Sequence, residues 1–210
     1  MRTPNPGSRF GMYERETNET RVYVSVDLDG TGNAQISTGV GFLDHMLAQL
    51  ARHGSIDLVI SATGDLAVDE HHTVEDVGIC LGKAVQQALG DMRGVQRYGW
   101  AIVPMDESLA TVAIDLSGRP LLVFHAAFQR ERVGQLPTEL VAEFFRAFVS
   151  HAHATLHIQL HHSSNDHHAI EAIFKAFAKA LEMATRFNPR QPGAPSTKGY
   201  IEGTEPPSGL

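Results

Sequence analysis

A five-residue pattern, His-His-x-x-Glu, occurs twice in this chain and constrains both its fold and its chemistry. The copies are His71–Glu75 and His167–Glu171, and each begins a segment with helical periodicity. On an α-helix, adjacent residues diverge by about 100°, whereas residues three or four apart share a face. Each copy therefore places its Glu beside a His and directs its two imidazoles apart. Four imidazoles and two carboxylates suit two divalent metals bound through nitrogen and oxygen.

The segments before the two motifs also repeat, which predicts a duplicated fold. Each motif follows an expected helix, strand and loop, with helices at 42–52 and 138–150 and strands at 55–62 and 154–160. The spacing agrees, because 26 residues separate His45 from His71 and 24 separate Glu143 from His167. Alternating apolar and polar residues predict further strands, at 21–30, 33–37, 100–103, 108–116 and 121–128.

These elements predict an α+β fold made of two half-repeats, 13–92 and 93–187, with helices packed on one face of a sheet. The pattern leaves open whether the halves share one sheet. Residues 1–12 are rich in Pro, Gly and Ser, so we expect disorder there. The Pro- and Gly-rich residues 188–210 are expected to form a tail.

Composition excludes several classes of partner. The net charge of −7 argues against a surface built for nucleic acid or an acidic membrane. There is no apolar run of about 18 residues and no signal-peptide pattern at the N-terminus. The one cysteine, Cys80, cannot form an internal disulfide, so the expected compartment is the reducing cytoplasm.

Alignment of the two halves extends the set of candidate metal ligands. It pairs His45 with Glu143, and each lies on the helix before its own motif. The candidates are then His45, His71, His72, Glu75, Glu143, His167, His168 and Glu171. Because no thiolate is available, Mn²⁺, Fe²⁺ or Co²⁺ suits this set at least as well as Zn²⁺. Asp44 and Asp166 each directly precede a candidate ligand. Each carboxylate could either orient the N–H of an imidazole ligand or cap the start of a helix.

Several longer motifs resemble the imidazoleglycerol-phosphate dehydratase family of histidine biosynthesis, from about Arg15 to Gly199. They are Arg15–Thr20, Gly41–Leu47, Asp69–Asp76, Pro104–Glu107, Asp115–Pro120, Asp166–Ala172, Phe174–Ala176 and Pro195–Gly199. The resemblance implies duplicated halves of the ribosomal-S5-domain-2-like kind and two Mn²⁺ ions per active site. It also implies sites shared between neighbouring subunits of a homo-oligomer, built from trimers and containing about 24 subunits.

The implied reaction is loss of water from D-erythro-imidazoleglycerol phosphate, giving imidazole-acetol phosphate, with the substrate ring held as a metal-bound imidazolate. We expect Glu171 or a metal-bound hydroxide to handle the carbon proton, Glu19 to stabilise the electron-poor intermediate, and Asp106 to support proton transfer. Positions matching the family's substrate contacts are Gln49, His53, Arg97, Arg119, Lys175, Ser196 and Lys198. Ser196 and Lys198 lie in the tail, which makes part of it a substrate lid.

One position departs from the family pattern, since many members carry His where this chain has Glu143. A carboxylate there can still bind a metal, but it changes the charge of the site. A different activity on the same scaffold, a dinuclear metal-dependent hydrolase, is the main alternative. Two further alternatives are an RNA-binding module and a structural shell whose subunits are assembled through metals. The negative net charge disfavours the RNA-binding module.

Overall fold

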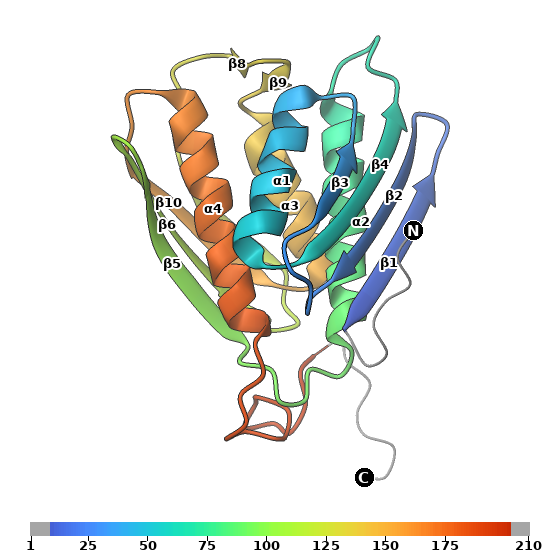
Figure 1. Ribbon diagram of the computed structural model, residues 1–210, viewed down its shortest axis with the longest axis vertical. Coiled ribbons are helices and arrows are strands. Elements are labelled where there is room, and N and C mark those ends of the chain that lie inside the picture. The colour runs from blue at the N-terminus through green and yellow to red at the C-terminus, as the bar shows by residue number, and fades with distance from the viewer. Residues whose placement is uncertain (1–8, 203–210) are drawn as a thin grey trace.

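The computed structural model describes residues 9–202, in which two four-stranded β-sheets enclose four long helices (Figure 1). The first half contains β1 (Phe10–Glu16), β2 (Thr20–Asp27), β3 (Ala34–Ser37), α1 (Gly41–Gly54), β4 (Asp57–Gly64) and α2 (His71–Leu89). The second half contains β5 (Tyr98–Met105), β6 (Ser108–Asp115), β7 (Leu121–His125), β8 (Arg132–Val133), β9 (Leu136–Pro137), α3 (Leu140–Ala152), β10 (Thr155–His162) and α4 (Asp166–Thr185). Strand β8 pairs with β9 in a separate two-stranded sheet.

The two sheets have the same topology. Their strand orders are β1-β2-β4-β3 and β5-β6-β10-β7. In each sheet the last pair, β4 with β3 or β10 with β7, is parallel and the other neighbours are antiparallel. This correspondence confirms the predicted duplicated α+β fold. Across residues 9–202 no strand pairing merges the two sheets, so the halves have separate sheets rather than a common one.

The helices pair across the two halves, between the sheets (Figure 1). Helix α2 covers the first sheet and packs against α3, whereas α4 covers the second sheet and packs against α1. Two glycines let α2 approach α3 closely. A Cβ on Gly78 would lie 2.7 Å from the Phe144 carbonyl oxygen, and one on Gly82 would lie 2.5 Å from that of Phe148. This crossed pairing places each His-His-x-x-Glu helix beside the earlier helix of the other half.

A cluster of phenylalanines holds α3 and α4 together. Five phenylalanines in this cluster are at most 1 % exposed: Phe144, Phe145 and Phe148 of α3, and Phe174 and Phe177 of α4. Their ring centroids lie 5.0–5.3 Å apart across the helix interface. Burying a phenylalanine stabilises the fold by about 2–3 kcal/mol relative to leaving it exposed. The cluster therefore fixes α4, which carries the second motif.

The expected strand boundaries need correction at the N-terminus. Most of the segment predicted to be disordered, residues 1–8, lies outside the described residues, but Phe10–Met12 already belong to β1. Strand β1 pairs with β2 along its length, and Met12 N donates to Gln87 Oε1 of α2 at 2.7 Å. Sequence alternation missed this strand because it is an edge strand with a mostly exposed surface. Along residues 9–202, no helix is long and apolar enough to cross a membrane.

Equivalent glycines let the first strand of each sheet lie directly on a helix, and we expect Gly11→Ala and Gly99→Ala to be strongly destabilising. A Cβ at either position would lie 1.9 Å from a helix carbonyl oxygen, that of Ala84 or Ala180. Relief requires the strand to move, which costs about 3 kcal/mol. Denaturant unfolding at fixed protein concentration measures the loss. Gly193→Ala, where no atom lies within 4 Å of the added Cβ, is the control and should shift the midpoint little.

Candidate active site

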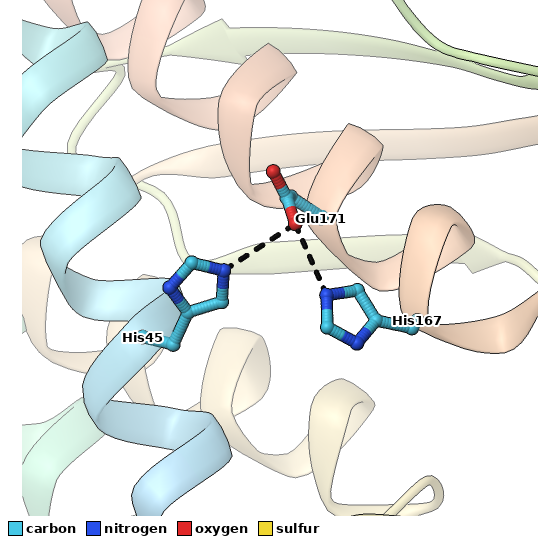
Figure 2. A group of neighbouring side chains, drawn as sticks. All are labelled: His45, His167 and Glu171. Atoms are coloured by element: carbon cyan, nitrogen blue, oxygen red, sulfur yellow. Dashed lines mark ion pairs between the residues drawn. The ribbon is translucent and has the colours of Figure 1, made fainter.

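Two histidines and a glutamate from different halves meet between α1 and α4 (Figure 2). His45 Nε2 of α1 lies 3.4 Å from Glu171 Oε2 of α4, and His167 Nε2 lies 3.2 Å from the same oxygen. His167 and Glu171 are four residues apart and so share one helix face. The three ligand atoms lie within 4.8 Å of one another, close enough to bind a single metal ion. The crossed pairing of α1 with α4 thus brings together three of the eight predicted metal ligands.

Glu171 is the buried member of this cluster, with a side chain only 7 % exposed. Its Oε1 lies 2.7 Å from Lys175 Nζ, one turn further along α4. Burial raises the pKa of Glu171, but Lys175 and His45 lower it by more, so the net pKa lies below its usual value. The carboxylate is therefore ionised at neutral pH and available as a metal ligand.

The second histidine of the first motif is held between two carboxylates. His72 Nδ1 lies 3.1 Å from Asp65 Oδ2, and His72 Nε2 lies 3.8 Å from Glu19 Oε2. Asp65 follows β4, and Glu19 lies in the turn between β1 and β2. The hydrogen bond to Asp65 raises the pKa of His72 above its usual value, and the charge of Glu19 adds to this effect.

The second histidine of the second motif has the same surroundings. His168 Nδ1 lies 2.8 Å from Glu107 Oε2, and His168 Nε2 lies 3.9 Å from Asp106 Oδ2. Both acids lie in the turn between β5 and β6. The hydrogen bond from His168 lowers the pKa of Glu107 to about 2, and Glu107 in turn raises the pKa of His168.

Within each motif the adjacent imidazoles diverge, as helix geometry predicts. The ring centroids of His71 and His72 lie 6.1 Å apart with planes at 82°, and those of His167 and His168 lie 6.1 Å apart at 85°. One ring of the second motif therefore faces α1, while its neighbour faces the β5–β6 turn. A single ion cannot take both rings of one motif in this arrangement.

The equivalent cluster on α2 and α3 is not assembled in the same way. In the part of the chain that the structure describes, His71, Glu75 and Glu143 do not converge as His45, His167 and Glu171 do. Glu143 is paired with Arg146 instead, one turn further along α3. The carboxylate of Glu143 attracts this guanidinium.

Two of the predicted substrate contacts lie on α1 after His45. Gln49 Oε1 lies 2.8 Å from His53 Nε2, one turn away. Burial lowers the pKa of His53, and the positive charges of Lys175 and Lys179 lower it further. The ring of His53 is therefore neutral at pH 7 and lies near the cationic face of α4.

Except for Lys175, the remaining predicted substrate contacts border a separate cavity of about 520 Å³, between the second half and the tail. Its lining includes Arg97, Arg119, Ser196 and Lys198. Arg97 is largely committed, because it donates to both oxygens of Asp115 at 2.7 and 3.1 Å and to the Pro195 carbonyl at 2.9 Å. Arg119 and Lys198 are each 57 % exposed on their side chains, so both can receive an anionic group.

The carboxylate of Glu202 lies between these two exposed cations. Its oxygens are 2.6 Å from Lys198 Nζ and 3.8 Å from Arg119 Nη1. The contact demonstrates that the cations are close enough to bind one anion together. Lys175 does not join them, since it is bound to Glu171.

The cavity and the histidine cluster lie at opposite ends of α4. Arg97 N donates to the Ala184 carbonyl near the last turn of α4, whereas His167 is in its first turn. Seventeen residues separate His167 from Ala184, which at about 1.5 Å per residue is roughly 25 Å. One small substrate cannot touch both regions of the same chain.

The orienting carboxylates are not the ones that sequence suggested. Asp44 accepts hydrogen bonds from the Thr38 backbone N–H and hydroxyl, and Asp166 accepts from the backbone N–H groups of Gln129 and Arg130. Of the two explanations expected for these residues, imidazole orientation or helix capping, no hydrogen bond within residues 9–202 corresponds to the first. They brace the loops before α1 and β8, and helix α4 is capped by Asn165.

Comparison with known proteins identifies relatives along nearly the whole chain. Residues 38–181 match the family model described as imidazoleglycerol-phosphate dehydratase. The chain is 55 % identical over 195 residues to the imidazoleglycerol-phosphate dehydratase of Syntrophobacter fumaroxidans, covering 93 % of this chain and 99 % of that protein. It is 56 % identical over 195 residues to that of Ralstonia pickettii, covering 92 % and 100 %.

Two crystal structures with the same name resemble this fold. The Staphylococcus aureus dehydratase is 43 % identical, with a TM-score of 0.77 over 85 % of this chain and 99 % of its own. The Pyrococcus furiosus protein, crystallised with (S)-C348, is 34 % identical, with a TM-score of 0.78 over 90 % and 100 %. None of these comparisons supports a hydrolase on this scaffold.

Proposed function

Since this chain belongs to the imidazoleglycerol-phosphate dehydratase family and dehydrates D-erythro-imidazoleglycerol phosphate in histidine biosynthesis, we propose that it does so with two divalent metals, in sites completed by a neighbouring subunit. The observation that carries this proposal is the convergence of His45, His167 and Glu171 from two helices. The substrate loses a hydroxyl and a carbon-bound proton, and the product is imidazole-acetol phosphate.

The donor chemistry fits a pair of Mn²⁺ ions. His45, His167 and Glu171 offer two imidazole nitrogens and a carboxylate oxygen to one ion, a mixture that suits Mn²⁺ and other divalent transition metals. The candidates for the other ion are His71, Glu75 and Glu143, which residues 9–202 do not bring together in the same way, since Glu143 is paired with Arg146. The Nε2 atoms of His72 and His168 would reach ions bound mainly by other chains. When bound, the metals would supply Lewis acidity and hold the substrate's imidazole ring in its anionic form.

The carboxylates around the histidines have separate roles in this proposal. Glu171 is ionised and fixed by Lys175, so it holds its ligand position and is the candidate for moving the carbon-bound proton. Glu19 and Asp106 lie beyond the Nε2 atoms of His72 and His168 at 3.8 and 3.9 Å. They can stabilise positive charge that develops on the substrate ring and support proton transfer there.

Binding of the phosphate group is assigned to the cavity bordered by the tail. Arg119 and Lys198 already hold a carboxylate between them, and Ser196 lies in the same wall. Arginine and lysine together suit a phosphate. Because this cavity lies about 25 Å along α4 from the histidine cluster, the phosphate-binding residues and the metal ligands of one site come from different subunits. The tail then acts as a lid over a neighbour's substrate.

A homo-oligomer follows from this division of the site. The outer face of the second sheet exposes Tyr98, Trp100, Ile102 and Leu121, each 48 % or more exposed. Large apolar side chains gathered on one face are typical of an interface. We propose an assembly built from trimers, with about 24 subunits, in the cytoplasm, where the single buried Cys80 stays reduced.

Incubation with imidazoleglycerol phosphate tests the proposal. Manganese-loaded protein should form imidazole-acetol phosphate, followed by its absorbance or by phosphorus NMR, with the phosphoester intact. Release of inorganic phosphate without dehydration would favour the hydrolase instead.

Arg119→Ala tests the phosphate site. Removing a charged hydrogen-bond donor costs about 1.5–3 kcal/mol, so we expect KM to rise about 10- to 100-fold with a smaller change in kcat. Affinity for Mn²⁺, measured by chelator competition, should stay within about twofold of the original value. Arg93→Ala, an exposed arginine away from the cavity lining, is the control. Equal losses of substrate and metal affinity would contradict a phosphate role.

A further inference from the structure

The second histidine of each motif makes a hydrogen bond through Nδ1 to a carboxylate that no metal-ligand pattern includes. The partners are Asp65 for His72, at 3.1 Å, and Glu107 for His168, at 2.8 Å. In both cases the opposite ring atom, Nε2, points toward a different acid. The two halves therefore share one arrangement of the second imidazole.

The two carboxylates come from positions that are not equivalent in the repeat. Asp65 follows β4, whose counterpart in the second half is β10. Glu107 lies in the β5–β6 turn, whose counterpart is the β1–β2 turn. A duplicated ancestral residue cannot explain both acids, so the same contact is built twice from different elements. That convergence points to a functional requirement on the imidazole.

The requirement follows from imidazole chemistry. A neutral histidine carries one N–H and one lone pair, and an ionised carboxylate can only accept a hydrogen bond. A contact between Nδ1 and a carboxylate therefore requires Nδ1 to hold the proton, which leaves the lone pair on Nε2. A metal-binding histidine needs its lone pair on the atom that faces the ion.

We propose that Asp65 and Glu107 are positioning residues, which fix His72 and His168 in the Nδ1–H form and aim Nε2 at the metal. The proposal rests on the metal role assigned above. Both acids are themselves held in place. Asp65 N donates to the Glu19 carbonyl at 3.1 Å, and its own carbonyl accepts from Val68 N at 2.7 Å. Glu107 Oε1 accepts from Ser108 Oγ at 3.2 Å and from Ser164 N at 3.4 Å.

Hydrogen bonds made by the backbone allow a positioning role of the side chain to be distinguished from a role in folding. The backbone contacts of Asp65 survive replacement of its side chain, so Asp65→Ala should leave the loop in place. Asp65→Asn keeps an oxygen that can accept from Nδ1–H, although it removes the charge. The matching pair at the other site is Glu107→Ala and Glu107→Gln.

Mn²⁺ affinity of metal-stripped protein, measured by chelator competition, is the first readout. We expect Asp65→Ala and Glu107→Ala to weaken binding about 10- to 100-fold, and Asp65→Asn and Glu107→Gln to recover most of that loss. Glu14→Ala, which removes a carboxylate 51 % exposed on β1, should leave the affinity unchanged within about twofold. Alanine variants that bind Mn²⁺ as tightly as the original protein would overturn the proposal. So would amide variants no better than alanine.

Nitrogen-15 NMR of histidine-labelled, metal-free protein is the second readout, and it does not depend on metal binding. At about pH 9, where the rings are neutral, His72 and His168 should carry the proton on Nδ1. Asp65→Ala should shift His72 alone toward a mixture of the two forms, and Glu107→Ala should do the same to His168. A predominant Nε2–H form in the unsubstituted protein overturns the proposal. Protein that shows the Nδ1–H form but binds no Mn²⁺ would instead refute the metal role.

Discussion

Glu171→Gln should lower kcat by about 10³-fold while leaving the fold intact. The substitution keeps the size of the side chain but removes the charge that lies 3.4 Å from His45 Nε2, 3.2 Å from His167 Nε2 and 2.7 Å from Lys175 Nζ. A neutral amide is a poor metal ligand and cannot take up a proton. It also leaves the nearly buried ammonium group of Lys175 without a counter-charge. That ammonium would then repel a metal ion bound beside it.

The matched control for Glu171→Gln is Glu182→Gln on the same helix. Glu182 is also largely buried and paired with cations, Lys179 at 3.2 Å and Arg186 at 2.6 Å, but it lies about three turns from Glu171. Its replacement should change kcat by less than about twofold. Steady-state kinetics and Mn²⁺ titration measure both variants. If Glu171→Gln kept more than about a tenth of the original kcat, the buried carboxylate would have no central part in the reaction.

Removal of the metals should abolish activity and reduce the size of the particle together. The candidate metal ligands are imidazoles and carboxylates, most of them near helix starts. The phosphate cavity of the same chain lies too far from these ligands for one substrate to contact the cavity and the metals together. Metals that complete a site between chains should also join those chains. We expect dialysis against EDTA to lower the rate more than about 100-fold, with smaller species in light scattering.

Restoration by Mn²⁺ and treatment with manganese-saturated EDTA are the controls for metal removal. Added Mn²⁺ should bring back both the rate and the large particle, whereas the manganese-saturated chelator, which has no capacity left for Mn²⁺, should change neither. Loss of activity with unchanged particle size would argue against metals between subunits, although it would leave the catalytic role intact. Unchanged activity after verified removal of all divalent metals would refute that role.

The duplicated histidine motif was enough to predict much of the fold. It located the starts of α2 and α4 within a few residues and identified the repeat that both sheets follow. Helix periodicity also predicted that adjacent imidazoles diverge, as the rings of His167 and His168 do. These features depend on short-range geometry, and a helix encodes short-range geometry in residue spacing.

Contacts between distant segments could not be predicted from spacing. The pairing of α2 with α3 depends on which helix faces fit together. Gly78 and Gly82 of α2 indicate that pairing only once α3 is known to lie against them. Asp65 and Glu107 escaped notice for the same reason, because each reaches its histidine from a turn in another element. A carboxylate in a turn has many ordinary explanations, and which one applies depends on what packs against that turn.

The matching strand orders also have a consequence for how such a chain could arise. One half alone would present α1 and α2 with no layer to cover them, so an unfused ancestor would have needed to associate with a second copy of itself. Joining the copies in one polypeptide made that association permanent and let the two versions diverge. Position 45 carries an imidazole and the equivalent position 143 carries a carboxylate, a difference that two identical partners could not have.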